Sequence, residues 1–304
     1  MKVFTHNFNP TSNSGPNKFT RTLFKSLIKE KDVSLSEQQE ADVEFCLIQQ
    51  QQHKVKPMLL RLDGIWFNSE QDFRKQNAPI HFSYKNADAV VFQSEFNKKL
   101  TEAWFGAHDN SFVVHNAADE KIIAAANKHF WDQKFNGKDI ELWSCASNWR
   151  PHKRLRDNVM YFLEFAPKKA QLAIAGGLGM DEAKEIMSLD KRIHILGDLD
   201  YMSLLSLYKR SSTFIHLSYL DHCPNVVVDA QAAGCHIICS STGGTKEVVS
   251  KGTAILEDEW NFSPIPLYKP PKIDFTNSID ITAGANKTIK DCSEKYYEIM
   301  KGIQ

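Results

Sequence analysis

The chain has 304 residues, of which 42% are hydrophobic and 24% charged, a balance typical of folded globular proteins and unlike that of disordered chains. Its formal net charge is +0, which provides no overall attraction to nucleic acid, so no nucleic-acid partner is expected. The length favours two domains, and no apolar run approaches the roughly 20 residues that cross a bilayer.

The first residues and the cysteines indicate the compartment. The opening MKVFTHNFNP lacks the apolar core of a secretory signal. The six cysteines form no C-x-x-C pair and mostly stand in apolar runs, so we expect buried thiols in a reducing, cytoplasmic environment. The histidines are scattered without an H-x-x-x-H pair, and no metal site is expected.

Short apolar runs alternate with helical patterns along most of the chain, which predicts α/β layers around parallel sheets. In the first half, we predict strands at 1–5, 43–48, 58–62, 89–92 and 111–114. A polar loop over 7–18 precedes an amphipathic helix whose apolar face carries Phe19, Leu23, Leu27 and Ile28.

A polar, glycine-containing stretch at 134–139 interrupts this alternation, and a fresh strand begins at Ile140. We therefore expect an N-terminal domain over 1–137, a C-terminal domain over 138–285 and a closing helix within 286–304. In the second half, we predict strands at 140–145, 171–175, 192–196, 213–217 and 236–239, and helices at 155–165, 201–209, 224–233 and 245–249. Ligands of such folds bind at the carboxyl ends of the strands.

The most specific pattern lies in residues 214–249. An apolar strand is followed by a loop that carries Asp221. Pro224 suits the first turn of the next helix, because its missing N–H would be unpaired there in any case. Gly234 ends that helix, and Gly243–Gly244 makes a tight turn after a further strand. Two helix N-termini would then be available to bind a diphosphate.

Two carboxylates accompany this arrangement. Asp221 precedes the helix and Asp229 lies eight positions later, inside it, with Asn225 beside the helix start. The helical run between them, about a turn and a half, places the two carboxylates at different depths along one ligand. Carboxylates accept hydrogen bonds well from vicinal hydroxyls such as those of a ribose or a hexose.

This segment resembles the E-x7-E signature of retaining glycosyltransferases with the GT-B fold, a large family that includes sucrose synthase and bacterial mannosyltransferases. Both signature glutamates are aspartates here. The residues in register with the signature are Asp221, Pro224, Asn225, Asp229, Ala230, Ala232, Gly234, Gly243, Gly244 and Glu247. The resemblance implies two Rossmann-like domains facing each other across a cleft, with the C-terminal helix crossing back to the first domain. It also implies that Asp229 binds the donor ribose and Asp221 the donor sugar.

Residues 144–155, SCASNWRPHKRL, resemble the family's G-R-x4-K-G element, whose two cations bind the donor diphosphate. Lys153 takes the lysine position. Ser147 or Asn148 stands at the arginine position, and Arg150 is the alternative source of the second charge. The other cations of this region, which we expect to face solvent, are Arg154 and Arg156.

Several further residues resemble parts of the same family. Gly15 resembles the glycine loop that opens the first helix near the donor phosphates, and Gly176 and Gly197 resemble two loops on the donor side. Asp63, followed by a glycine, replaces the histidine that faces the transferred sugar in many members; an aspartate can bind sugar hydroxyls or an acceptor proton. Four aromatic residues form an acceptor surface, a peripheral membrane contact or ordinary core: Trp66, Phe67, Trp104 and Phe105.

The candidate catalytic residues are therefore Lys153, Asp221 and Asp63. The candidate donor-binding residues are Gly15, Asn148, Arg150, Lys153, Gly176, Gly197, Asp221, Pro224, Asn225, Asp229, Gly243 and Gly244. The resemblance implies retaining, metal-independent transfer of a hexose-type sugar from a nucleotide-diphosphate sugar to a hydroxyl of a glycan, a lipid-linked acceptor or a small molecule. The donor is a substrate, and no cofactor is implied.

Two alternatives stay open at this point. One is a catalytically degenerate protein of the same fold that binds a nucleotide sugar or a glycan. The other is a nucleotide-sugar epimerase of the same fold, for which no acid pair with a histidine is found in the sequence. The nucleobase, the sugar, the acceptor and the oligomeric state also stay open.

Overall fold

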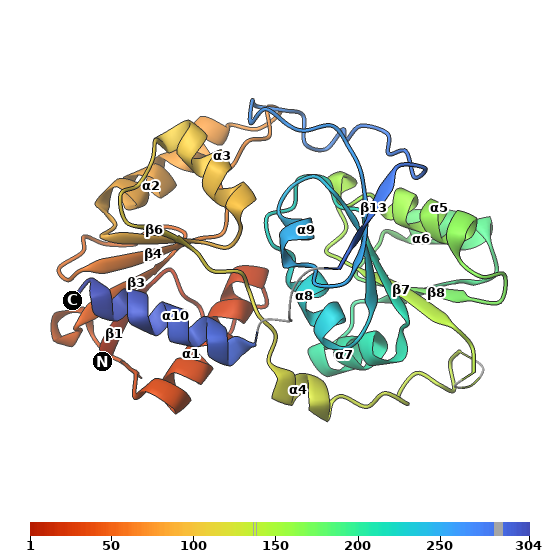
Figure 1. Ribbon diagram of the computed structural model, residues 1–304, viewed down its shortest axis with the longest axis horizontal. Helices are drawn as coiled ribbons and strands as arrows, with labels where there is room; N and C mark the ends of the chain where they lie inside the picture. The colour runs from red at the N-terminus through yellow and green to blue at the C-terminus, as the bar shows by residue number, and fades with distance from the viewer. Residues whose placement is uncertain (136, 138, 283–287) are drawn as a thin grey trace. The chain divides into compact units, whose positions relative to one another are not determined.

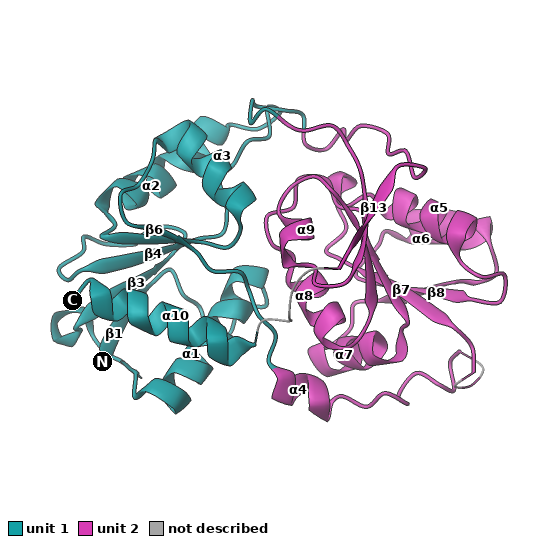
Figure 2. Ribbon diagram, viewed as in Figure 1, with its two compact units in different colours: residues 1–119, 261–266, 287–304 teal, residues 120–260, 267–286 magenta. Residues whose placement is uncertain are grey.

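The computed structural model describes residues 1–135, 137, 139–282 and 288–304, which form two compact units. Figure 1 shows the elements of both units, and Figure 2 colours unit 1 teal and unit 2 magenta. Unit 1 comprises Met1–Asp119, Asn261–Pro266 and Lys287–Gln304, and unit 2 comprises Glu120–Trp260 and Leu267–Asn286.

Unit 1 is built on a six-stranded parallel sheet, counted over the described residues, with the strand order β2-β1-β3-β4-β5-β6. Its strands are β1 (Lys2–His6), β2 (Ser34–Leu35), β3 (Val43–Leu47), β4 (Met58–Leu62), β5 (Ala89–Phe92) and β6 (Ser111–Val113). Every residue of the three strands β3, β4 and β5 is buried, as expected for parallel strands that are covered on both faces.

The helices of unit 1 are α1 (Gly15–Lys31), η1 (Gln38–Glu40), α2 (Phe73–Asn86), α3 (Glu95–Phe105) and α10 (Ile289–Gly302). The C-terminal helix α10 packs along α1, as Figure 1 shows. Tyr296 and Met300 of α10 are fully buried in the same apolar core as Val3 and Phe45 of the sheet. The last helix of the chain is therefore part of the first domain.

Unit 2 is built on a seven-stranded sheet, in the part of the chain that the structure describes, with the order β13-β12-β11-β10-β7-β8-β9. Its strands are β7 (Leu142–Ala146), β8 (Gln171–Ala175), β9 (Ile193–Gly197), β10 (Thr213–His216), β11 (His236–Ser240), β12 (Gly252–Ile255) and β13 (Ser278–Ile281). The edge strand β13 is antiparallel to β12, and the other pairings are parallel.

The helices of unit 2 are α4 (Glu120–Ala125), η2 (Pro151–Lys153), α5 (Leu155–Phe165), α6 (Met180–Leu189), α7 (Tyr201–Arg210), α8 (Asn225–Ala232) and α9 (Thr245–Val248). Each unit is a sheet of parallel strands with helical crossovers, to which unit 2 adds one antiparallel edge strand, so the prediction of two Rossmann-like domains is confirmed.

The two units divide between Asp119 and Glu120, earlier in the chain than the expected boundary at 137–138. The segment after Asp119 belongs to unit 2 because α7 holds it: Lys209 Nζ donates to the carbonyl oxygens of Ala124 (3.0 Å) and Ala126 (2.8 Å). Trp131 Nε1 also donates to a backbone carbonyl of α7, at 3.0 Å. The expected boundary positions 138, 285 and 286 lie outside the described residues.

Candidate functional site

Asp221 lies in the loop after β10, at the carboxyl edge of the unit 2 sheet. The neighbouring loop after β11 holds its backbone, because the N–H of Gly244 donates to the carbonyl oxygen of Asp221 at 2.7 Å. Gly243 has a φ of 72°, and a Cβ added there would stand 2.5 Å from that oxygen and 2.8 Å from the Asp221 nitrogen. The predicted glycine turn therefore exists, and glycine is required because the two loops touch.

The carboxylate of Asp221 is the centre of a small polar cluster. Its Oδ2 lies 2.5 Å from Lys153 Nζ and 3.0 Å from His216 Nε2. Burial opposes ionisation of Asp221, but Lys153 and His216 hold its pKa well below the usual range. The structure thus brings together two of the predicted residues, Lys153 and Asp221, which are far apart in the sequence.

Sequence reasoning missed His216. A signal was available, since this histidine interrupts an otherwise apolar strand run (FIHL) at the end that faces the ligand edge. Burial lowers the pKa of His216, against the opposing effect of Asp221. Burial likewise lowers the pKa of His152 to about 3 and that of His222 to about 4. These three imidazoles are therefore neutral near pH 7, and Lys153 is the cation that touches the carboxylate.

The loop after β7 carries the residues that resemble the diphosphate element. Ser147 N and Trp149 Nε1 both donate to the carbonyl oxygen of Ala175 at the end of β8, at 3.3 Å and 3.0 Å. A Cβ on Gly176 would stand 2.0 Å from the Ser147 oxygen, so this glycine permits close packing of the two loops. The side chains of Asn148 and Arg150 on this loop are exposed.

Arg154 contradicts the expectation that it faces solvent. Its guanidinium is buried and makes two hydrogen bonds to the carboxylate of Glu257, at 2.9 Å and 2.7 Å, and a third to the Pro271 oxygen at 2.8 Å. The residue has a left-handed φ of 51° between η2 and α5, a turn that sequence periodicity does not reveal. Arg156 does face solvent and pairs there with Glu185.

Asp229 lies on α8, and its Oδ2 accepts a hydrogen bond from the Tyr201 hydroxyl at 3.2 Å. Tyr201 begins α7, shortly after Gly197 at the end of β9, and Gly197 in turn accepts from the N–H of Gly176 at 2.8 Å. The predicted residues on these neighbouring loops thus lie along one edge of the sheet.

The start of α8 differs slightly from the prediction. Pro224 is the N-cap residue of α8 rather than a residue of its first turn, and Asn225 is the first helical residue. The second predicted helix, α9, has only four residues. Its contribution to anion binding is therefore small, because the helix macrodipole sums over aligned peptide units.

Asp63 and Gly15 belong to unit 1. Gly15 is the first residue of α1, so the helix begins before the end of the predicted loop over 7–18, and Pro16 suits its first turn. Asp63 follows β4, and its carboxylate is paired with the guanidinium of Arg61, which is fully buried. Arg61 also donates to Asn116 Oδ1 at 2.8 Å and lies 4.4 Å from the centre of the Phe19 ring. This buried network fixes the Asp63 carboxylate, and sequence reasoning missed its other members.

The four aromatic residues do not behave alike. Phe67 is core, whereas Trp66 is 43% exposed. Trp104 Nε1 donates to the Phe262 oxygen at 2.8 Å. Trp104 and Phe105 line a groove of about 370 Å³ between α2 and α3, together with Phe73, Arg74, Asn77, Ala78 and His81.

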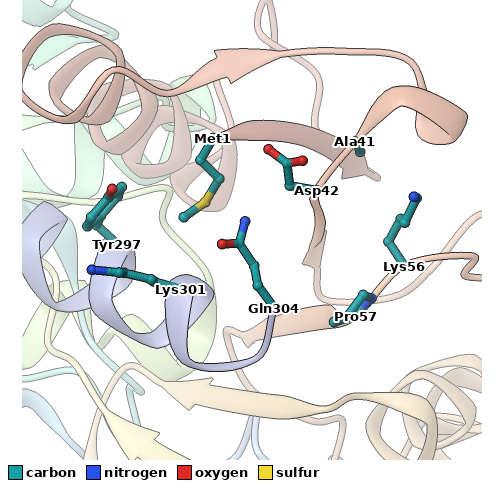
Figure 3. Close-up of a pocket in the computed structure, with 8 residues that line it drawn as sticks. All are labelled: Met1, Ala41, Asp42, Lys56, Pro57, Tyr297, Lys301 and Gln304. Carbon is teal, nitrogen blue, oxygen red and sulfur yellow. The ribbon is translucent and has the colours of Figure 1, made fainter.

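A cavity of about 650 Å³ in unit 1 lies at the amino-terminal ends of the parallel strands, beside the start of β1, β3 and β4 (Figure 3). It is lined by Met1, Ala41, Asp42, Lys56, Pro57, Tyr297, Lys301 and Gln304. Parallel α/β sheets bind their ligands at the carboxyl ends of the strands, so this cavity is not where the fold places a substrate.

The described residues contain no group of three or more His, Cys, Asp or Glu side chains suited to a metal ion. They also contain no helix with the length and apolar character needed to span a membrane. All six cysteines are described, and each is a buried free thiol, as predicted.

Comparison with solved structures defines the class of the fold. Sucrose-phosphate synthase from Thermosynechococcus elongatus superposes with a TM-score of 0.66 over 100% of this chain and 94% of its own, at 12% identity. A glycosyltransferase from Rickettsia africae ESF-5 gives 0.64 over 99% and 98%, at 16% identity. Anabaena Alr3699/HepE in complex with UDP-glucose gives 0.63 over 100% and 91%, at 14% identity. The fold is therefore that of the GT-B glycosyltransferases.

The amino-acid sequence of unit 2 also matches a protein family. Residues 137–261 match the family described as glycosyl transferases group 1, and this span contains every predicted donor-binding residue of unit 2. This match confirms, over that segment, the resemblance to a glycosyltransferase family that the sequence motifs indicated. No curated protein sequence matches the chain.

Proposed function

We propose that the protein is a retaining, metal-independent glycosyltransferase that moves a hexose-type sugar from a nucleotide-diphosphate sugar to a hydroxyl acceptor. The observation that carries this proposal is the position of Lys153, whose ammonium group contacts Asp221 at the carboxyl edge of the unit 2 sheet. Both side chains are mostly buried, at 18% and 14% exposed, so their electrostatic interactions with a ligand are only partly screened.

The leaving group of such a transfer is a nucleoside diphosphate, which gains negative charge as the glycosidic bond breaks. A preorganised ammonium group stabilises that charge, and a single donor of this kind typically contributes about 3–4 kcal/mol to catalysis. The histidines around Asp221 are neutral, so Lys153 supplies this charge in the cluster. The acceptor hydroxyl attacks from the face that the diphosphate leaves, which needs no enzymic nucleophile.

Asp229 is suited to the donor ribose, because a carboxylate accepts from two vicinal hydroxyls and its Oδ2 is already oriented by Tyr201. The nucleotide sugar follows by analogy with the Anabaena structure, which holds UDP-glucose in the same fold. Asp221 is assigned to the donor sugar, and Asp63 to the acceptor hydroxyl. Gly176, Gly197, Gly243 and Gly244 allow the backbone loops to approach the donor.

One observation favours a second function, which is nucleotide-sugar binding without transfer. The Asp63 carboxylate, which replaces a histidine of many family members, is paired with the buried guanidinium of Arg61. A guanidinium beside a carboxylate stabilises the ionised form, so the carboxylate takes up a proton less readily and is a weaker base. If Asp63 must receive the acceptor proton, turnover will be slow even though the donor binds.

A two-stage experiment separates these functions. A thermal-shift panel of UDP-, GDP- and ADP-sugars identifies the donor, since a ligand that binds the folded state raises stability by about 2.7 kcal/mol at 100 times its Kd. Release of the nucleoside diphosphate is then measured with glycan, lipid-linked and small-molecule acceptors, with and without EDTA. Nucleotide release that resists EDTA supports the proposal. Binding without release from any donor and acceptor pair would show a binding protein.

A further inference from the structure

His216 is a polar residue at the end of a buried strand. Its side chain is 5% exposed, and its ring stacks on Phe214 of the same strand at 6.3 Å between ring centres. Its Nε2 lies 3.0 Å from the same Asp221 oxygen that Lys153 Nζ contacts at 2.5 Å. One carboxylate oxygen therefore accepts from an imidazole and an ammonium group together.

The hydrogen in the His216–Asp221 contact belongs to the imidazole. Asp221 faces Lys153 at contact distance, so its carboxylate is ionised and has no hydrogen to donate. Nε2 of His216 must then carry the hydrogen, which defines the tautomer of the neutral ring. A neutral donor holds the carboxylate without adding a second positive charge that would compete with Lys153.

The backbone of Asp221 is fixed separately. Gly244 donates to its carbonyl oxygen at 2.7 Å, and Gly243 packs against its nitrogen and oxygen without space for a side chain. An aspartate has one methylene fewer than the glutamate of the family signature, so its reach is set mainly by where the backbone and the carboxylate are held. In this chain both ends of the residue are held, the backbone by the glycine turn and the carboxylate by His216.

We infer that His216 is a positioning residue for donor use: it fixes the carboxylate of Asp221, which in turn holds the Lys153 ammonium where the donor diphosphate leaves. This inference rests on the proposed function. A histidine that only fills space in the core would contribute equally whether or not Asp221 offered an acceptor atom. A positioning role requires that atom.

The test compares donor Kd and kcat/KM in four proteins. His216→Phe keeps the ring and removes the donor, and it should weaken donor use by roughly 10- to 100-fold, the usual effect of losing a hydrogen bond to a charged group. His216→Gln places an amide nitrogen near the position of Nε2 and should recover most of that loss. His236→Phe is the matched control: this ring begins the neighbouring strand, bonds Thr253 at 3.1 Å and should not affect the donor.

A double-mutant cycle supplies the readout that packing alone would not change. In an Asp221→Ala background, His216→Phe should add less than about twofold to the loss, because coupled residues are not additive. The inference is overturned if His216→Phe costs as much in that background as in the wild type, or if it binds and turns over the donor normally. If the wild-type protein binds no nucleotide sugar, the proposed function itself fails. If the wild type binds and uses the donor and His216→Phe does so equally well, only the inference about His216 fails.

Discussion

Gly243 and Asp221 are in direct backbone contact: a Cβ on the glycine would stand 2.5 Å from the Asp221 carbonyl oxygen. This contact joins the loops after β10 and β11, which carry Asp221, Pro224, Gly243 and Gly244 of the signature. The predicted glycine turn is therefore a packing requirement as well as a conformational one, and the contact explains why a side chain at 243 would move the aspartate.

Gly243→Ala should destabilise the protein and weaken donor binding together. The left-handed φ of 72° alone costs an alanine roughly 1–2 kcal/mol, and the collision with Asp221 adds to this. Thermal unfolding and donor titration measure the two effects. Gly302→Ala is the control, since a Cβ added at this end of α10 would meet no described atom within 4 Å beyond its chain neighbours and its own helix backbone. Equal donor affinity in Gly243→Ala and wild type would contradict the prediction.

Lys153→Ala and Asp229→Ala should each abolish the stabilisation that the donor confers, while the proteins remain folded. The first removes the charge opposite the diphosphate, and the second removes the carboxylate assigned to the ribose. The thermal shift in saturating donor checks both variants against their own donor-free midpoints. Arg156→Ala is a matched control, because Arg156 lies three positions from Lys153 but is exposed and paired with Glu185. A donor shift retained in both variants would overturn the assigned site.

The stability of the folded chain should decrease as the pH falls from about 6.5 towards 4. His152 and His222 have pKa values of about 3 and about 4 in the folded protein, below the ordinary value of 6.5. In this window the unfolded chain binds more protons than the folded chain, so acidification favours unfolding, by about 1.4 kcal/mol per pH unit for each histidine. The lowered pKa of Asp221 acts in the same direction, but only below about 3.9.

Urea denaturation at a series of pH values measures this slope. His152→Phe should flatten it, because the ring contact with Tyr268, at 5.5 Å between ring centres, can be kept while the titrating group is removed. A free energy of unfolding that is constant between pH 7 and 5 would show that these histidines are not held in their neutral form.

Much of the fold was predictable from local pattern. The predicted strands at 58–62, 89–92 and 171–175 coincide with β4, β5 and β8, because buried parallel strands read as largely apolar runs. The edge strand β13 is mostly exposed, and it has no such run to reveal it. The position of the unit boundary was not predictable either, since it depends on Lys209 and Trp131 contacts that span many residues.

The candidate site was predictable where a motif defined it and not where tertiary contacts did. Spacing identified Asp221, Asp229 and Lys153. The partners of these residues, His216 and Tyr201, come from other strands and helices, and only the folded chain shows that they meet. A cation in a basic loop is usually exposed, so the sequence predicts that Arg154 faces solvent. Its carboxylate partner, Glu257, follows β12, and only the fold brings the two side chains together.

The pair of Arg154 and Glu257 supports the last prediction, which concerns stability. Arg154 is fully buried at its side chain, Glu257 is 6% exposed, and Glu257 also accepts from the hydroxyl of Ser240. Removing one partner leaves the other charge buried and unpaired, which typically costs about 3–5 kcal/mol. Arg154→Met and Glu257→Gln should each lower the free energy of unfolding by about that amount, as urea denaturation would measure. The double variant should cost less than the sum of the two, because neither charge is then left alone. Additive losses would show that the two side chains stabilise the fold independently.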